Sequence, residues 1–193
     1  MMRMETLEIT APKEVARRYT SAEFRLLPQG PPYFELINGT LVRSPSPKFP
    51  HQHASNELVF LLNLYVRERG IGIVLSAPMD VEFDQFNTFQ PDILFISSER
   101  SHLITGDGDI VGAPDLVVEI LSKNRVKDLG TKRYFYEIHN VREYWIVDLQ
   151  KKTIEVLENQ DMEFVRHSYA KRTGEVESKL LPGFRVNVEE IFE

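Results

Sequence analysis

The chain has 193 residues, 42% hydrophobic and 27% charged, with a formal net charge of -6. This composition is typical of one folded domain and excludes a disordered or membrane-embedded chain, because no apolar run approaches the roughly 20 residues of a membrane span. The lack of cysteine excludes disulfides, thiolate zinc sites and a cysteine nucleophile. No secretory signal is evident over 1–13, so we expect a cytoplasmic protein.

The first half of the chain predicts helices and strands in alternation. In chain order these are a helix over 21–27, a hairpin of strands 33–37 and 40–43, a helix over 53–69, and strands 71–75 and 79–83. The hairpin is predicted by Asn38-Gly39, a strong two-residue turn signal. Apolar residues at helical spacing predict the long helix, and Gly70 ends it.

The second half predicts mostly strands around one further helix. In chain order these are strands 93–97 and 116–121, a helix over 132–139, strands 143–147 and 153–157, a hairpin reaching 168, and strands 176–181 and 184–188. Gly106-Asp107-Gly108-Asp109 lacks the downstream glutamate of a calcium loop and is predicted to be a turn. We expect an N-terminal extension over 1–20 and one α/β domain over 21–193, built around a mixed sheet flanked by helices.

Two carboxylates stand in or beside strands that are otherwise apolar. Glu119 lies inside Leu116–Leu121, where a lone charge costs several kcal/mol unless it is paired, protonated or bound to a metal. Asp92 begins the strand after Pro91. If the two strands are neighbours, both acids converge where the sheet splays open, and their oxygens suit Mg²⁺ or Mn²⁺.

A third element of this constellation is the helix after the second acidic strand. Asp128, Lys132 and Tyr136 are spaced four apart and share one helix face. From this face Lys132 could reach the carboxylates, offset their charge and orient an attacking water. The alternative is a surface salt bridge between Asp128 and Lys132, with Tyr136 half-buried.

Other candidates carry weaker signals. His51 stands before or at the start of the long helix without an HExxH pattern, so zinc hydrolysis is not expected. Glu35 is an acid in an apolar strand, and alternation can point it to solvent. The acidic net charge argues against a protein that coats nucleic acid non-specifically. Three basic segments are candidates for a local basic face, and the alternative is that each is an ordinary solvated surface. The candidate basic segments are 123–127, Lys132-Arg133 and Lys171-Arg172.

These residues, in this order, resemble the Uma family of restriction endonucleases, a branch of the PD-(D/E)XK nuclease superfamily. The matching pieces are 33–39, His51, Pro91-Asp92, 114–122, Asp128, Lys132, Tyr136, 141–148 and 181–184. Each piece is weak alone, but the ordered set is specific and covers nearly the whole chain.

The resemblance implies a restriction-endonuclease-like core and a metal-dependent site. Asp92 matches the acid of the Pro-Asp element and Glu119 that of the (D/E)XK element, so both are expected to hold Mg²⁺ or Mn²⁺. The motif lysine is replaced by Leu121, and Lys132 matches the recurrent lysine of this family, ahead of Lys123. Glu35, His51, Asp128 and Tyr136 are second-tier candidates.

We therefore expect a metal-dependent endonuclease that acts on DNA, with no membrane partner. A symmetric homodimer is consistent with cutting both strands of a duplex. The alternative is a catalytically silent nuclease-like domain that serves as a binding module. A metal-dependent hydrolase of another phosphoester fits the same residues.

Overall fold

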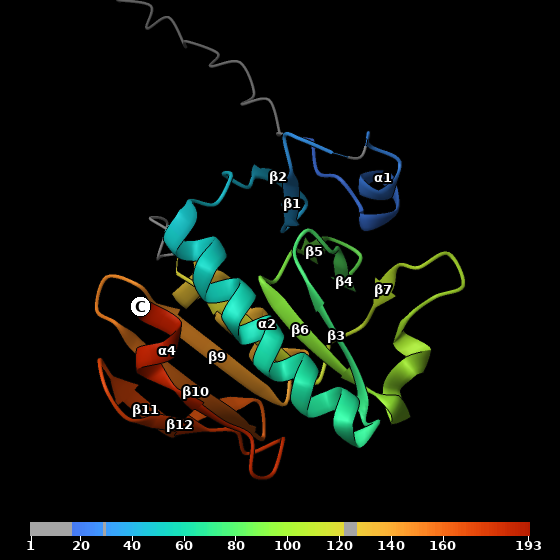
Figure 1. Cartoon of the computed structure of the whole chain (residues 1–193). Coiled ribbons are helices and arrows are strands. Elements are labelled where there is room, and N and C mark those ends of the chain that lie inside the picture. Colours follow the sequence, from blue (N-terminus) through green and yellow to red (C-terminus); the bar gives the residue numbers. More distant parts are fainter. Residues whose placement is uncertain (1–16, 29, 122–126) are drawn as a thin grey trace, which may run out of the picture.

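The computed structural model describes residues 17–28, 30–121 and 127–193 (Figure 1). Its helices are α1 (Ser21–Arg25), α2 (Phe49–Arg69), the 3-10 helix η1 (Ser98–Leu103), the π-helix η2 (Lys127–Lys132), α3 (Arg133–Ile138) and α4 (Val188–Phe192). Its strands are β1 (Phe34–Ile37), β2 (Thr40–Arg43), β3 (Gly72–Ser76), β4 (Val81–Asp84), β5 (Asn87–Phe89), β6 (Ile93–Ser97), β7 (Ile110–Val111), β8 (Leu116–Ile120), β9 (Glu143–Asp148), β10 (Thr153–Gln160), β11 (Glu163–Lys171), β12 (Glu175–Glu177) and β13 (Arg185–Asn187).

The strands form a large mixed sheet and two smaller sheets. The six-stranded sheet has the order β11-β10-β9-β8-β6-β3, in which only β8 and β9 are parallel. A five-stranded sheet, β2-β1-β5-β4-β7, contains the N-terminal hairpin, and β12 pairs with β13. The predicted α/β fold with a mixed sheet is confirmed.

The six-stranded sheet has a hydrophobic core on each face. Alternate residues of β8 point to opposite sides, so Leu116, Val118 and Ile120 join one core while Val117 joins the other. Helix α2 packs against the first core and crosses the sheet (Figure 1). Because both faces of β8 are buried, Glu119 is enclosed by protein.

The observed elements differ from the predicted ones mainly at their ends. Helix α2 begins at Phe49 rather than His53, because Pro50 is compatible with the first turn of a helix. The predicted strand over 184–188 ends at Asn187, whose side chain accepts a hydrogen bond from Glu189 N (3.1 Å) and caps α4. The short strands β5 and β7 have no clear sequence signal and were not predicted.

The buried Asp115 ties the start of β8 to its neighbours. Its carboxylate accepts hydrogen bonds from Ser97 N (2.8 Å), Arg100 Nη1 (3.2 Å) and Arg142 Nη1 (3.1 Å). Burial alone raises the pKa of Asp115, but the bonds from Ser97 and Arg142 and the charge of Arg100 outweigh it and hold the pKa below 3.8.

This lowered pKa predicts a dependence of stability on pH. A depressed carboxyl pKa stabilises the fold above pH 3.8, and this contribution is lost as the pH falls through the native value. We expect Asp115→Asn to lower the free energy of unfolding by about 3 kcal/mol at pH 7, because it leaves guanidinium groups without their anion. Urea unfolding at pH 7 and below pH 3.8 measures the difference, which should shrink in acid. A constant difference would contradict the charge-based explanation.

A second buried carboxylate, Glu143 at the start of β9, holds the segment after β12. It accepts hydrogen bonds from Trp145 Nε1 (2.7 Å) and Ser178 Oγ (2.6 Å) through one oxygen. The other oxygen accepts from the backbone of Lys179 (2.7 Å) and Leu180 (2.8 Å). This carboxylate therefore ends β12 and fixes the following turn against the main sheet.

Candidate active site

The register of the central strands places the two predicted acids next to each other. Strands β6 and β8 are antiparallel neighbours whose last pair is Ile93 with Val118. One step beyond this pair stand Asp92 and Glu119, on opposite strands. The register therefore brings the two positions side by side at one end of β6 and β8.

At this point of the ladder, the side chain of Asp92 takes the place of a backbone hydrogen-bond acceptor. Pro91 has no N–H to donate, and the Asp92 carboxylate accepts the N–H of Ile120 at 2.7 Å. The second carboxylate oxygen of Asp92 lies 3.3 Å from His51 Nε2 in the first turns of α2. The Asp92 side chain keeps 17% of its surface exposed, so this acid is open to solvent and to a ligand.

Lys132, at the end of η2, reaches the buried acid of β8. Its Nζ lies 2.8 Å from Glu119 Oε1 and 2.9 Å from Glu35 Oε1, and all three side chains are at most 4% exposed. Lys132 thus supplies a cation to the face of β8 on which the motif lysine would stand. Leu121 occupies that position and packs into the apolar core.

Glu35 is buried, which corrects the expectation that alternation points it to solvent. Glu35 is 1% exposed, because its side chain points to Lys132 and to the segment just before β6. Besides Lys132, the Glu35 carboxylate accepts from Gln90 N (2.9 Å) and Ser44 Oγ (3.4 Å). The N-terminal hairpin therefore brings a third acid to the lysine.

Tyr136 and Lys132 converge on the same carboxylate oxygen. The Tyr136 hydroxyl donates to Glu119 Oε1 at 2.6 Å, and the tyrosine is fully buried rather than half-buried. The alternative of Lys132 in a surface salt bridge is wrong, because Lys132 is itself buried. Asp128 belongs to η2, but its side chain lies outside the described residues.

Comparison with known proteins assigns the chain to one family. The model of Uma2, described as "putative restriction endonuclease", matches residues 21–189. The chain belongs to the Uma2 family. No curated protein matches the chain.

Four chains of solved structures also match. One is a protein from Anabaena variabilis ATCC 29413, described as a "putative nuclease belonging to DUF820". It shares 24% sequence identity and a TM-score of 0.73, with 90% of this chain and 97% of that chain covered. The restriction-endonuclease-like fold expected from the sequence is thereby confirmed.

Two further polar residues adjoin the candidate site and were not predicted. Gln90 donates its backbone N–H to Glu35 and its side-chain amide to Asp80 Oδ1 (2.8 Å). Burial raises the pKa of the Asp80 carboxyl, the bond from Gln90 opposes this, and the charge of Asp109 adds to it. Asp80 precedes a short strand without any motif, so only the tertiary contact through Gln90 reveals it.

The predicted basic segments have different outcomes. Lys132-Arg133 is not a basic face, because Lys132 is enclosed by two acids. Residues 122–126 and the Lys127 side chain lie outside the described residues. Lys171 and Arg172 are exposed at the end of β11.

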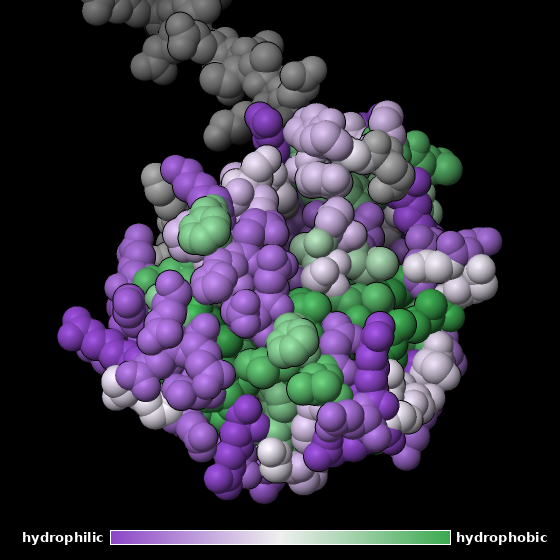
Figure 2. Space-filling model, viewed as in Figure 1, coloured by the Kyte–Doolittle hydropathy of each residue, from purple (hydrophilic) through white to green (hydrophobic). Residues whose placement is uncertain are grey.

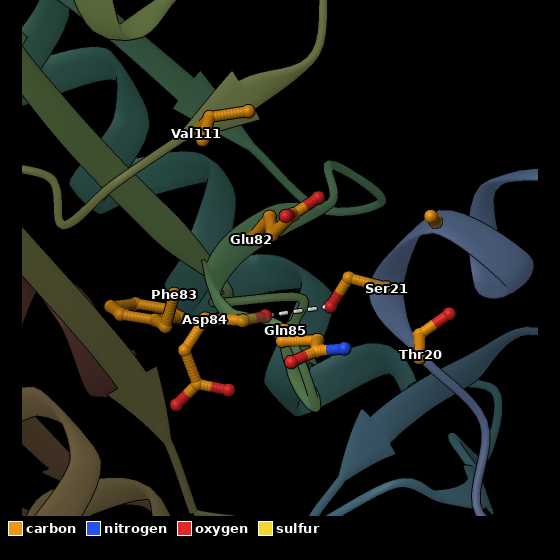
Figure 3. A pocket seen from close by; sticks show the side chains of 8 residues that line it. Thr20, Ser21, Glu82, Phe83, Asp84, Gln85 and Val111 are labelled. Atoms are coloured by element: carbon orange, nitrogen blue, oxygen red, sulfur yellow. Dashed lines mark hydrogen bonds between the residues drawn. The ribbon is translucent and has the colours of Figure 1, made fainter.

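A separate hollow of about 300 Å³ lies beside α1 and β4 (Figure 3). Its lining includes Thr20, Ser21, Glu82, Asp84 and Gln85, and none of the predicted site residues. Ser21 Oγ donates to the backbone oxygen of Asp84 at 2.7 Å, which anchors α1 to β4. This hollow is part of the packing of the N-terminal region.

Helices in the described ranges are too short or too polar to cross a membrane.

Membership of Uma2, together with the nuclease-like fold, supports a nuclease that acts on a nucleic acid.

Proposed function

We propose that this Uma2 protein is a metal-dependent endonuclease that hydrolyses phosphodiester bonds in DNA. One observation carries the proposal. Lys132 of η2 lies 2.8 Å from Glu119 of β8, and Asp92, just before β6, accepts the N–H of the adjacent Ile120, so the three residues gather at one end of the central sheet. A fold needs no buried lysine between two carboxylates at that place, because such a pair seldom stabilises more than apolar packing does.

The donor set fits Mg²⁺ or Mn²⁺. Across the described ranges, no three histidine or acidic side chains cluster into a complete ligand set. Mg²⁺, however, is usually held by one or two carboxylates and completed by waters and substrate phosphates. Asp92 and Glu119 would hold the ion, which supplies a Lewis acid for the phosphate and an acidified water.

The remaining residues prepare this site. Lys132 offsets the charge of the buried acids and donates a hydrogen bond toward the attacking water or the phosphate. Tyr136 fixes the Glu119 carboxylate through its hydroxyl, and His51 orients Asp92. Glu35 keeps Lys132 in place from the side of the N-terminal hairpin.

The direct test is cleavage of supercoiled plasmid by the purified protein with Mg²⁺ or Mn²⁺. We expect nicked or linear DNA that disappears with EDTA, and a loss of rate of at least about 100-fold in Asp92→Asn. Glu99→Gln, which changes an exposed acid in η1, is the matched control and should cleave normally. Equal cleavage by Asp92→Asn would refute the assignment of the site.

A binding module without catalysis is the second candidate. It is favoured by one feature, namely that Lys132 already pairs with both Glu119 and Glu35 without any added ion. Titration with Mn²⁺, followed by calorimetry, separates the two functions. Binding that Asp92→Asn abolishes supports the nuclease, whereas no binding to the wild type favours the module.

The proposal extends to a homodimer, since cutting both strands is simplest with two sites. Strand β3 ends the six-stranded sheet, and Phe60, Leu64 and Ile73 are 63%, 48% and 41% exposed beside it. Figure 2 shows this apolar area over α2 and β3. Sedimentation velocity measures the assembly, and a monomer at micromolar concentration would exclude it.

A further inference from the structure

A group of exposed cations lies at the end of the sheet that carries the candidate site. We define the basic edge as Lys151 and Lys152, between β9 and β10, together with Lys171 and Arg172 at the end of β11. We propose that the basic edge binds the phosphate backbone of duplex DNA and aligns it with Asp92 and Glu119. This inference rests on the proposed nuclease function.

The strand register places the basic edge on the same side as the acids. Strand β9 is parallel to β8 and pairs Val147 with Ile120, so both strands end together. Across the next strands, Asp148 pairs with Thr153, and Thr153 pairs with Lys171. At about 4.8 Å per strand, Lys171 lies ~14 Å from β8, which is about four nucleotides along one DNA strand.

The backbone at the basic edge is held in an unusual conformation. Lys152 and Arg172 have φ values of +52° and +64°, in the left-handed region that asparagine and glycine normally occupy. The two turns are joined, because Arg172 N donates to Lys152 O at 2.7 Å. Strained residues of this kind are retained more often where the side chain is used, so both cations are candidates for binding.

The basic edge also borders a hollow, and its four cations outnumber the acids beside it. The hollow of about 480 Å³ is lined by Lys151, Lys152 and Arg172 on one side and by Glu189 and Glu193 of the C-terminal segment on the other. Lys151 Nζ lies 3.9 Å from Asp148, whereas the ion pairs found in the described ranges include none of Lys152, Lys171 or Arg172. The two exposed glutamates offset the cations only in part, so an anion is favoured here.

The test measures binding separately from cleavage. A fluorescein-labelled 20-bp duplex is titrated by anisotropy in EDTA, and again with Ca²⁺, from 50 to 200 mM KCl. The variant is Lys152→Asn/Arg172→Asn, since asparagine removes the charge and accepts the left-handed backbone. We expect its slope of log K against log salt to be shallower by about two, with at least a tenfold loss of affinity at 100 mM.

The matched control removes two charges from the opposite end of the sheet. Arg67→Gln/Arg69→Gln changes exposed residues near the end of α2, about 27 Å from its start, and should bind within twofold of wild type. Equal losses in both variants, an unchanged slope in Lys152→Asn/Arg172→Asn, or no binding by the wild type would overturn the inference. Binding that follows the expected slopes without any cleavage would instead refute only the proposed nuclease function.

Discussion

Replacing Lys132 with methionine is expected to lower the free energy of unfolding by about 3–5 kcal/mol at neutral pH and to abolish cleavage. Methionine has a similar length but no charge, so the variant leaves Glu35 and Glu119 buried without their shared cation. Chemical unfolding and the plasmid assay measure the two effects. Arg133→Met, on the neighbouring half-exposed residue, is the control and should change the free energy of unfolding by less than about 1 kcal/mol.

A milder variant separates catalysis from folding. Glu119→Gln keeps Lys132 paired with Glu35, and its amide oxygen can still accept from Tyr136, so the fold should persist. The loss of charge should reduce the cleavage rate at least about 100-fold. Wild-type rates in both Lys132→Met and Glu119→Gln would exclude these residues from the reaction.

The lysine can also be returned to the strand. Leu121 shares a face of β8 with Glu119, so Lys132→Leu combined with Leu121→Lys moves the ammonium group to the position of the superfamily motif. We expect cleavage to recover in part relative to Lys132→Leu alone. Recovery would show that the reaction needs a cation beside Glu119, whether it comes from η2 or from β8.

The second large effect is expected at Glu143, where Glu143→Ala should lower the free energy of unfolding by about 4 kcal/mol. The change leaves four hydrogen-bond donors without their acceptor. They include Trp145 Nε1, Ser178 Oγ and the backbone N–H of Lys179. Urea unfolding measures the loss. Hydrogen exchange should rise first in the backbone of residues 179–181, because the turn is released from the sheet.

The control for this prediction is Glu163→Ala, which truncates an exposed acid at the start of β11. It should change the free energy of unfolding by less than about 0.5 kcal/mol. If the two variants are equally stable, the hydrogen bonds to Glu143 contribute no net stability.

Much of the fold could be predicted because local signals agreed with the tertiary structure. Asn38 and Gly39 both adopt positive φ in the hairpin, as the turn motif requires, and Gly70 ends α2 in the left-handed region. The two faces of β8 follow directly from alternation. The position of Glu119 follows as well, because a buried acid in an apolar strand is a strong signal on its own.

Contacts between distant segments could not be predicted in the same way. Alternation suggests that Glu35 faces solvent, since the sequence of β1 alone does not indicate that Lys132 and Gln90 pack against its carboxylate. The link from Asp80 through Gln90 to Glu35 depends on packing between separate strands. The basic pair Lys132-Arg133 was also misleading, because charge alone does not tell a buried lysine from an exposed one.

The pairing of Glu35 with Lys132 has a consequence for the newly synthesised chain. Asp92 and Glu119 leave the ribosome before Lys132, and the pair between Lys132 and Glu35 forms only once the N-terminal hairpin has docked beside η2. A growing chain therefore carries the carboxylates without their cation, and the complete constellation forms in one late folding step. The charged cluster is therefore absent from the nascent chain until Lys132 has been synthesised.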